Sequence, residues 1–324
     1  MNTKNSIDNR SGYLQRLSSA CRERTLVAFC LAVIVGVAFG SWRHDDICGM
    51  SPGTFWVMKS NWRQCADVVL AGDSRAYRGI SPAAMKKYLP DMRILNYGFS
   101  GAGFSGAYLR GLEDVLAFDS GRKIIVLGIT PHSLTEGAAR RNGFLTHIKK
   151  SPLEKQMLSL YEPVLHFLRP VESKEALGML TFGRFSTHYF QEYCRDGWVA
   201  AYKLPENANE ALKPYSMIFD PGKSGPVSDD IVNELIKTVA QWRGKGIEVY
   251  GFRLPTCSLM LELEAELAKF DEGTFVGKFE IAGGTWLAFD QTGYHTYDGS
   301  HLHREAAEKF SGELAQKIRA VEPK

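Results

Sequence analysis

The sequence lacks several features that would place it in a specialised class. It has no C-x-x-C pair, and none of its six cysteines stands at a spacing from histidine that suggests a zinc site. It has no strong charge of one sign, because 39 basic and 36 acidic side chains leave a net charge of +3, which argues against a dedicated nucleic-acid binder. A chain that is 44% hydrophobic and 23% charged, without repeats or low-complexity tracts, is also unlike a disordered, collagen-like or polytopic membrane protein. We therefore expect a globular protein with neither a metal nor another cofactor.

One long apolar run stands near the N-terminus. Thr25–Trp42 contains 18 residues without a charge, which as a helix would span about 27 Å, close to the thickness of a bilayer core. Residues 1–24 hold five basic and two acidic side chains, and this bias predicts a cytoplasmic N-terminus with everything after the run outside. The run is interpreted as an uncleaved anchor in the inner (cytoplasmic) membrane. Two alternatives stay open: a cleaved signal peptide, since Ala38-Phe39-Gly40 resembles a cleavage site, and a buried helix.

This interpretation divides the chain into four parts, of which the last is periplasmic or extracellular. They are a cytoplasmic tail (1–24), a transmembrane anchor (25–42), a stalk (43–65) and an exported domain (66–324). Four cysteines would lie outside, where disulfides persist, and Cys48 with Cys65 is the best local pair, although free thiols are an equal alternative.

From residue 66 onwards, short apolar runs alternate with longer amphipathic ones, which is typical of a parallel sheet covered on both faces. The predicted strands are Asp67–Ala71, Arg93–Tyr97, Lys123–Gly128, Ile247–Phe252 and Trp286–Phe289. The predicted helices are Pro82–Tyr88, Gly103–Ala117, Asp229–Arg243, Leu259–Lys269 and Arg304–Ala320. We expect an α/β fold, a three-layer α/β/α sandwich, with an insertion at about 131–226. That stretch has no clear strand, and its aromatic cluster at Tyr189–Trp198 is either a sugar-stacking platform or the core of the insertion.

Ligands of open α/β sheets bind beyond the carboxyl ends of the strands, so the residues just after each predicted strand are candidates for a site. The first strand leads into Gly72-Asp73-Ser74-Arg75, where Ser74 either projects a nucleophilic hydroxyl or caps a helix. Near the C-terminus, Asp298 stands three residues before His301 and can accept a hydrogen bond from its imidazole. Ser74, His301 and Asp298 together form a nucleophile, base and orienting carboxylate.

At these residues the sequence resembles the SGNH (GDSL-type) hydrolase superfamily. Gly72-Asp73-Ser74 matches its first block, and Asp298 with His301 matches its last block. The second block implies that Gly101, at the end of Asn96–Gly101, donates to the oxyanion. The third block usually carries an asparagine, which is replaced here by Thr130, so either the Thr130 hydroxyl donates or the backbone N–H groups of Ser74 and Gly101 act alone. The resemblance covers about residues 66–130 and 229–320.

The resemblance implies acyl, chiefly acetyl, transfer or hydrolysis on an extracytoplasmic polysaccharide through an acyl-serine. Membrane-anchored relatives that act on cell-surface polymers include alginate O-acetylation proteins and the protein that supports D-alanylation of teichoic acid. The implied partners are an acylated polysaccharide or an activated acyl donor and a multispanning membrane acyltransferase, with no nucleic acid. Two alternatives remain: a non-catalytic polymer-binding subunit of such a membrane complex, and an esterase or lipase for small esters.

Other polar residues near the predicted site have two interpretations each. Arg75 and Arg78 either bind an anionic group of the substrate or are solvated residues of a helix. His132 and His295 are reserve candidates for substrate contact, whereas His303 is expected to be a surface residue at a helix N-terminus.

Overall fold

The structure is a computed structural model that describes residues 22–35, 47–160 and 188–321. Residues 22–35 form a helix, and the rest of the predicted anchor, 36–42, lies outside the described residues, as does most of the predicted tail. Within the described ranges, no helix has the length and apolar character needed to span a bilayer.

The main sheet has five strands, all parallel, in the order β3-β2-β4-β7-β8. The strands are β2 (Val68–Ala71), β3 (Ile94–Asn96), β4 (Ile124–Ile129), β7 (Glu248–Arg253) and β8 (Thr285–Trp286). The predicted α/β class with a parallel sheet is confirmed, and each predicted strand overlaps or adjoins an observed one. These short runs are rich in β-branched residues, and β2 and β4 are buried along their whole length, as strands covered on both faces are.

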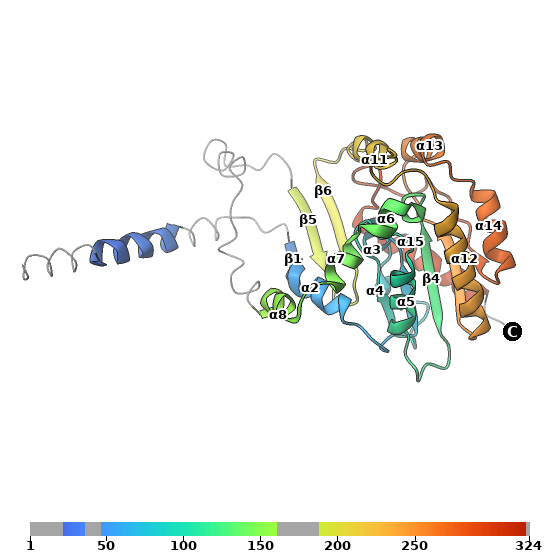
Figure 1. Ribbon diagram of the computed structural model, residues 1–324, viewed down its shortest axis with the longest axis horizontal. Coiled ribbons are helices and arrows are strands. Elements are labelled where there is room, and N and C mark those ends of the chain that lie inside the picture. The colour runs from blue at the N-terminus through green and yellow to red at the C-terminus, as the bar shows by residue number, and fades with distance from the viewer. Residues whose placement is uncertain (1–21, 36–46, 161–187, 322–324) are drawn as a thin grey trace, which may run out of the picture. The chain divides into compact units, whose positions relative to one another are not determined.

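Helices cover both faces of this sheet (Figure 1). One face packs against α5 (Gly106–Val115), α12 (Asp229–Gly244) and α14 (Glu272–Ile281). The other packs against α3 (Ser74–Gly79), α4 (Pro82–Met85) and α15 (Arg304–Ala320). Alternation along β2 explains the two cores, since Val69 joins the first cluster and Val68 and Leu70 join the second. The carboxyl end of β2, which leads to Ser74, is thus packed between the two layers of helices.

Local sequence signals fix where several helices begin. The hydroxyl of Ser81 accepts a hydrogen bond from the Ala84 N–H at the start of α4, and Pro82 occupies the first helical position. Ser105 caps α5 in the same way. Each cap satisfies an N–H that has no partner within its helix, so each helix begins at a defined residue.

A second, three-stranded sheet has the order β1-β5-β6. Its strands are β1 (Ile47–Gly49), β5 (His188–Tyr193) and β6 (Val199–Leu204), and β5 pairs antiparallel with β6 (Figure 1). Two of these strands lie in the stretch 131–226, where the sequence had indicated none. The aromatic residues of the pair do not alternate with polar ones, so they show no strand pattern. Tyr193 and Trp198 are buried, which supports a core role for this part of the aromatic cluster.

The same stretch also contains short helical elements, and residues 161–187 of it lie outside the described residues. These elements are η1 (His132–Leu134), α6 (Glu136–Arg140), α7 (Gly143–Ile148), α8 (Pro152–Leu160) and α11 (Leu212–Ile218). Between β7 and α14 the chain forms α13 (Ser258–Leu267), close to the predicted helix.

Part of the expected stalk is folded onto the α/β unit. Residues 47–65 contain β1 and α2 (Pro52–Ser60), and Phe55 and Lys59 of α2 are buried. Cys48 and Cys65 are free thiols, in contrast to the expected pair. Cys48 belongs to the small sheet, whereas the Cys65 N–H donates to the Val115 carbonyl at the end of α5, so the two cysteines belong to different parts of the fold.

Candidate active site

The turn after β2 places Ser74 at the first position of α3. Gly72 has a φ of +144°, and a Cβ there would lie 2.7 Å from both the Gly128 carbonyl oxygen and the Ala76 side chain, so the turn requires glycine. The Asp73 carboxylate accepts a hydrogen bond from the Arg75 N–H at 3.0 Å and is the cap of α3. Ser74 is therefore not the capping residue, and its hydroxyl is free to act elsewhere.

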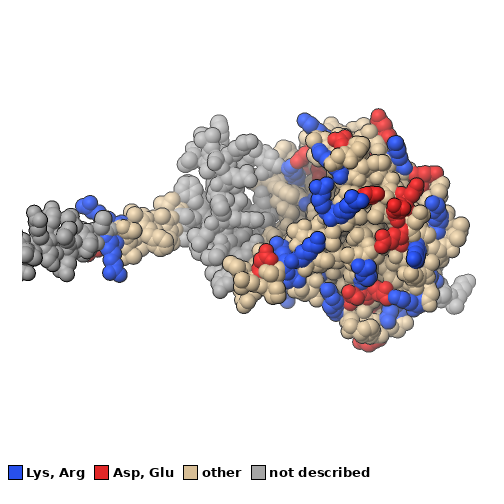
Figure 2. Space-filling model, in the orientation of Figure 1, with Lys and Arg blue, Asp and Glu red and all other residues tan. Residues whose placement is uncertain are grey.

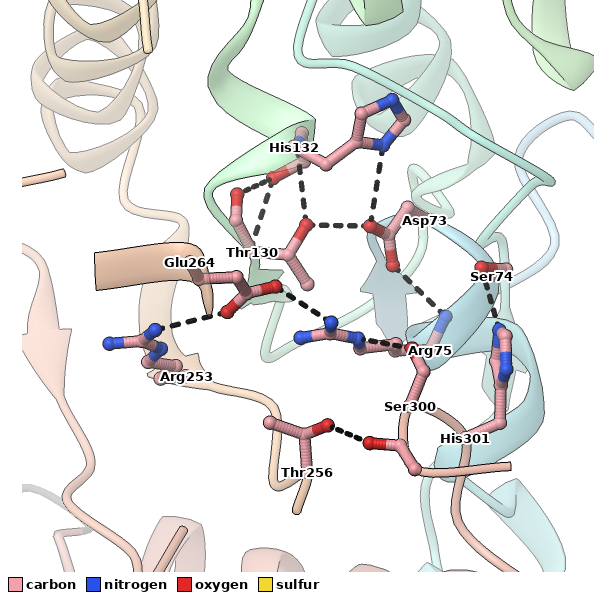
Figure 3. Close-up of polar contacts among 12 residues, drawn as sticks. Asp73, Ser74, Arg75, Thr130, His132, Arg253, Thr256, Glu264, Ser300 and His301 are labelled. Carbon is pink, nitrogen blue, oxygen red and sulfur yellow. Dashed lines mark hydrogen bonds and ion pairs between the residues drawn. The ribbon is translucent and has the colours of Figure 1, made fainter. Parts of the chain in front are cut away.

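Three predicted residues form one continuous hydrogen-bonded chain. The Ser74 Oγ lies 2.9 Å from the His301 Nε2, and the His301 Nδ1 lies 2.8 Å from the Asp298 Oδ2 (Figure 3 shows the first contact). Ser74 and His301 are 227 residues apart in the sequence. The other oxygen of Asp298 accepts hydrogen bonds from the backbone N–H groups of Ser300 and His301. This geometry is that of a nucleophile, a base and a carboxylate that orients the base.

A fourth side chain determines which nitrogen of His301 carries the proton. The Arg78 Nη1 lies 3.2 Å from the His301 Nε2. A guanidinium has only donors, so Nε2 accepts from Arg78, and the ring proton is on Nδ1, where it is donated to Asp298. The Tyr297 ring is stacked on the imidazole at a centroid distance of 5.8 Å and restricts its orientation. His301 is thus held in the tautomer that can accept the Ser74 proton.

Burial and neighbouring charges keep His301 neutral. Desolvation and the adjacent Arg78 and Arg75 lower the pKa of His301 below its ordinary value of 6.5, and Asp298 opposes this only in part. Burial works against ionisation of Asp298, but the contacts from His301 and from the backbone N–H groups outweigh it and hold the pKa of Asp298 well below its usual range. At neutral pH the site therefore contains a free base and an ionised carboxylate.

The lowered pKa of His301 predicts how the activity falls at acid pH, if His301 is the base of the reaction. The base works only when neutral, so kcat/KM should rise with pH and have its midpoint below 6.5. Arg78→Gln removes a positive charge beside the imidazole, and we expect the midpoint to move to higher pH. The measurement is a pH profile of ester hydrolysis for both proteins. A wild-type midpoint above 6.5, or no shift in the variant, would contradict this electrostatic account.

Two backbone N–H groups are available to stabilise an oxyanion. Among the described residues, neither the Ser74 N–H nor the Gly101 N–H donates a hydrogen bond to another group. Gly101 has a φ of +58°, and a Cβ built on it would lie 3.7 Å from the His132 Cε1. The segment that carries Gly101 is tied to the nucleophile turn, because the Phe99 N–H donates to the Gly72 carbonyl at 3.1 Å. Unpaired donors fixed near a nucleophile are what an oxyanion hole requires.

Thr130, one of the two alternatives for the oxyanion donor, directs its hydroxyl to Asp73. Its hydroxyl donates to the Asp73 Oδ2 at 2.6 Å and accepts from the Ser133 N–H (Figure 3). A hydroxyl has one proton, so Thr130 cannot donate to an oxyanion while it makes this contact. His132 also faces Asp73, with 3.9 Å between its Nδ1 and the Oδ2. Burial opposes ionisation of Asp73, but His132, Arg75 and Thr130 together lower its pKa, so the cap of α3 remains charged.

Arg75 points away from the substrate side of Ser74. Its guanidinium forms a buried ion pair with Glu264 at 2.7 Å, and its Nε donates to the Ser300 Oγ at 2.9 Å (Figure 3). Glu264 also pairs with Arg253 at 3.0 Å. Arg75 is 2% exposed, so it is not the solvated helix residue of one interpretation, and its contacts with Glu264 and Ser300 differ from the substrate-binding role of the other. No sequence signal indicates this network, because Glu264 is 189 residues from Arg75 and stands in an ordinary helical pattern.

The remaining histidine candidates, His295 and His303, contact each other and Glu206. His295 pairs with Glu206 at 2.8 Å and is largely exposed, and its ring is stacked on that of His303. His303 is the cap of α15, in line with its expected place at a helix N-terminus. Within residues 22–35, 47–160 and 188–321, no three histidine, cysteine or acidic side chains form a group able to hold a metal ion.

Comparison with known proteins adds little. No protein-family model matches the sequence, and neither does any curated protein. Among solved structures, the chain is similar to Est24, a carbohydrate acetylesterase from Sinorhizobium meliloti, at 14% identity and a TM-score of 0.33, over 78% of this chain and 99% of that chain. A TM-score this low carries no argument about the fold or the activity of this protein.

Proposed function

We propose that this protein is an SGNH-type serine acyltransferase or esterase that acts on acyl, chiefly acetyl, esters of an extracytoplasmic polysaccharide. The observation that carries the proposal is the aligned set Ser74, His301 and Asp298, with the His301 tautomer fixed by Arg78 on one side and Asp298 on the other. The match of Gly72-Asp73-Ser74 and of Asp298 with His301 to the first and last SGNH blocks supports the same assignment. Ser74 is also partly exposed, as a nucleophile must be.

The first half of the proposed reaction forms an acyl-serine. The His301 Nε2 takes the proton of the Ser74 hydroxyl while Oγ bonds to the acyl carbon. The carbonyl oxygen becomes an oxyanion that the Ser74 and Gly101 N–H groups stabilise. The bond from the acyl carbon to the sugar oxygen then breaks, and Nε2 gives its proton to that oxygen as the alcohol leaves.

The second half releases the acyl group. Water, or a second sugar hydroxyl, loses its proton to Nε2 and attacks the acyl-serine. The bond between the acyl carbon and Oγ then breaks, and the proton returns to Ser74. Water as the acceptor gives hydrolysis, and a sugar hydroxyl gives transfer. The same residues serve both outcomes, so the acceptor site decides which one dominates.

The extracytoplasmic setting is part of the proposal and depends on Thr25–Trp42 and on the basic bias of residues 1–24. In that setting a multispanning membrane acyltransferase would supply or receive the acyl group. A reporter enzyme that is active only outside the cytoplasm, fused after Lys324 of the full chain, tests the location. An inactive reporter, with the fusion protein present in full, would refute it.

Covalent labelling tests the catalytic part of the proposal. We expect a fluorophosphonate probe to label the full-length protein at Ser74, and Ser74→Ala to lose both the label and the hydrolysis of an activated acetyl ester. Ser81→Ala is a matched control, because Ser81 caps α4 and has no contact with His301. Mass spectrometry of the labelled peptide identifies the site. No label on Ser74, or equal turnover by Ser74→Ala, would reject an acyl-serine enzyme.

A non-catalytic polymer-binding subunit is the second candidate. The hydrogen bond from Thr130 to Asp73 favours it, because it removes the Thr130 hydroxyl from the donors of the oxyanion site. Loss of one oxyanion donor costs about 10²–10³-fold in rate in a hydrolase. The labelling experiment separates the two candidates, since a binding subunit does not react at Ser74.

A further inference from the structure

The two arginines that flank the nucleophile differ in their partners. Arg75 is neutralised by Glu264. Arg78 forms no ion pair with any carboxylate among the described residues, and its Nε is buried without a hydrogen-bond partner. Its backbone carbonyl accepts from the Trp198 indole N–H at 2.7 Å, which anchors this part of α3. The guanidinium of Arg78 is thus a partly exposed cation that forms no ion pair with a carboxylate of the described residues.

Aromatic rings surround this cation. Its Cζ lies 5.0 Å from the centroid of the Tyr77 ring and 5.5 Å from that of the Tyr189 ring. Such contacts compensate only part of the cost of removing a charge from water. The remaining N–H donors of the guanidinium are suited to a carboxylate or a phosphate, which Arg binds through parallel N–H groups. The guanidinium can therefore take a negative group from a bound ligand.

The position of Arg78 indicates which part of a substrate would carry that group. The His301 Nε2 delivers its proton to the leaving alcohol, and the Arg78 Nη1 lies 3.2 Å from this nitrogen. The guanidinium thus faces the alcohol side of an ester, not the acyl side. Residues 1–24 hold five of the 39 basic and two of the 36 acidic side chains, so the rest of the chain has 34 of each and no net charge. Figure 2 shows that both signs are interspersed on the face in view. Binding of an anion must accordingly depend on local groups.

We propose that Arg78 binds a carboxylate or phosphate on the alcohol part of the ester, so that the preferred substrates are acylated acidic sugars. This inference rests on the proposed function and names the substrate class of the same site. An anion bound there also competes with the His301 Nε2 for the Arg78 Nη1, which leaves the lone pair of Nε2 to the Ser74 hydroxyl. Binding of the correct sugar would then favour the catalytic contact between His301 and Ser74.

The test compares three acetylated methyl glycosides of glucose that differ at C6: methyl glucoside, methyl glucuronide and methyl glucoside 6-phosphate, which carry no charge, a carboxylate and a phosphate. We expect the full-length wild type to prefer one of the charged esters over the neutral one by about 10- to 100-fold in kcat/KM, the range for a hydrogen bond to a charged group. Arg78→Gln should reduce this ratio to within about threefold of one, and Arg78→Lys should retain part of it. The charged ester with the higher ratio identifies the anion.

Arg319→Gln is the charge-matched control. Arg319 lines a cavity of about 690 Å³ together with Asp67 and Arg93. Asp67 and Arg93 stand just before β2 and β3, at the amino ends of these strands, whereas Ser74 follows the carboxyl end of β2. This variant should keep the wild-type ratio. Equal turnover of all three esters by the wild type, or an unchanged ratio in Arg78→Gln, would overturn the role of Arg78 while leaving the proposed function intact. No turnover of any ester, with no label on Ser74, would instead reject the function itself.

Discussion

Asp298→Asn is expected to reduce the turnover of an acetyl ester by about 10⁴-fold, as the equivalent change does in a Ser-His-Asp triad. The Oδ1 of Asp298 accepts two backbone N–H groups, so the oxygen of an asparagine would stay there and its NH₂ would face the His301 Nδ1. A donor at that position forces Nδ1 to become the acceptor and moves the ring proton to Nε2, where it faces the Arg78 Nη1, so the contact with Arg78 is lost as well. Nε2 can then no longer accept the Ser74 proton. Steady-state kinetics of the purified full-length variant measures the loss.

Asp290→Asn is the control for this variant. Asp290 is exposed, and its carboxylate accepts hydrogen bonds from Thr292 in a surface turn, away from the imidazole. We expect its turnover to remain within about twofold of the wild type. If Asp298→Asn retained more than a tenth of the wild-type turnover while folded, the orienting role of Asp298 would be refuted.

Glu264→Gln is expected to lower the free energy of unfolding by about 3–5 kcal/mol, the usual cost of breaking a buried ion pair on one side. Glu264 is fully buried and pairs with Arg75 at 2.7 Å and with Arg253 at 3.0 Å. Without its charge, the buried guanidinium of Arg75 keeps no ionic partner, and its Nη1 already has no hydrogen bond. Urea unfolding of the two proteins measures the difference.

Glu272→Gln provides the comparison within the same network. Glu272 contacts the other side of Arg253 at 2.6 Å but is 35% exposed, so we expect a loss below about 1 kcal/mol. Because Arg75 also donates to Ser300, which stands between Asp298 and His301, the Glu264 variant should lose ester turnover as well. Equal stability of the two variants would mean that water reaches Glu264 and that the network is not a buried support of the site.

Thr130 connects these predictions to the proposed oxyanion site. Thr130 stabilises Asp73, and Asp73 caps the helix that begins with Ser74, so the residue in place of the expected asparagine supports the nucleophile instead of the oxyanion. In the proposed reaction, the backbone N–H groups of Ser74 and Gly101 donate to the oxyanion whichever acceptor attacks.

The sequence was sufficient for the main sheet and for the identity of the central residues. Short Val- and Ile-rich runs predicted the strands. A strand that is buried on both faces, such as β4, is apolar along its length and can be recognised from its own residues. Asp298 and His301 were recognisable because their three-residue spacing is itself the geometry that joins them. The strands β5 and β6 were missed, since their side chains show no alternation and their pairing depends on the rest of the fold.

What the sequence by itself determined, then, is the α/β class and the pair Asp298 and His301, because both depend on local pattern, whereas Ser74 meets His301 across 227 residues only in the folded chain. Only the tertiary structure decided the roles of the neighbouring polar residues. Arg75 and Arg78 have the same side chain and stand three positions apart in one short helix, yet one is neutralised by Glu264 and the other faces His301 without an ionic partner among the described residues. The role of a charged side chain depends on its partner and on its burial, and both come from segments that are distant in the sequence and close only after folding.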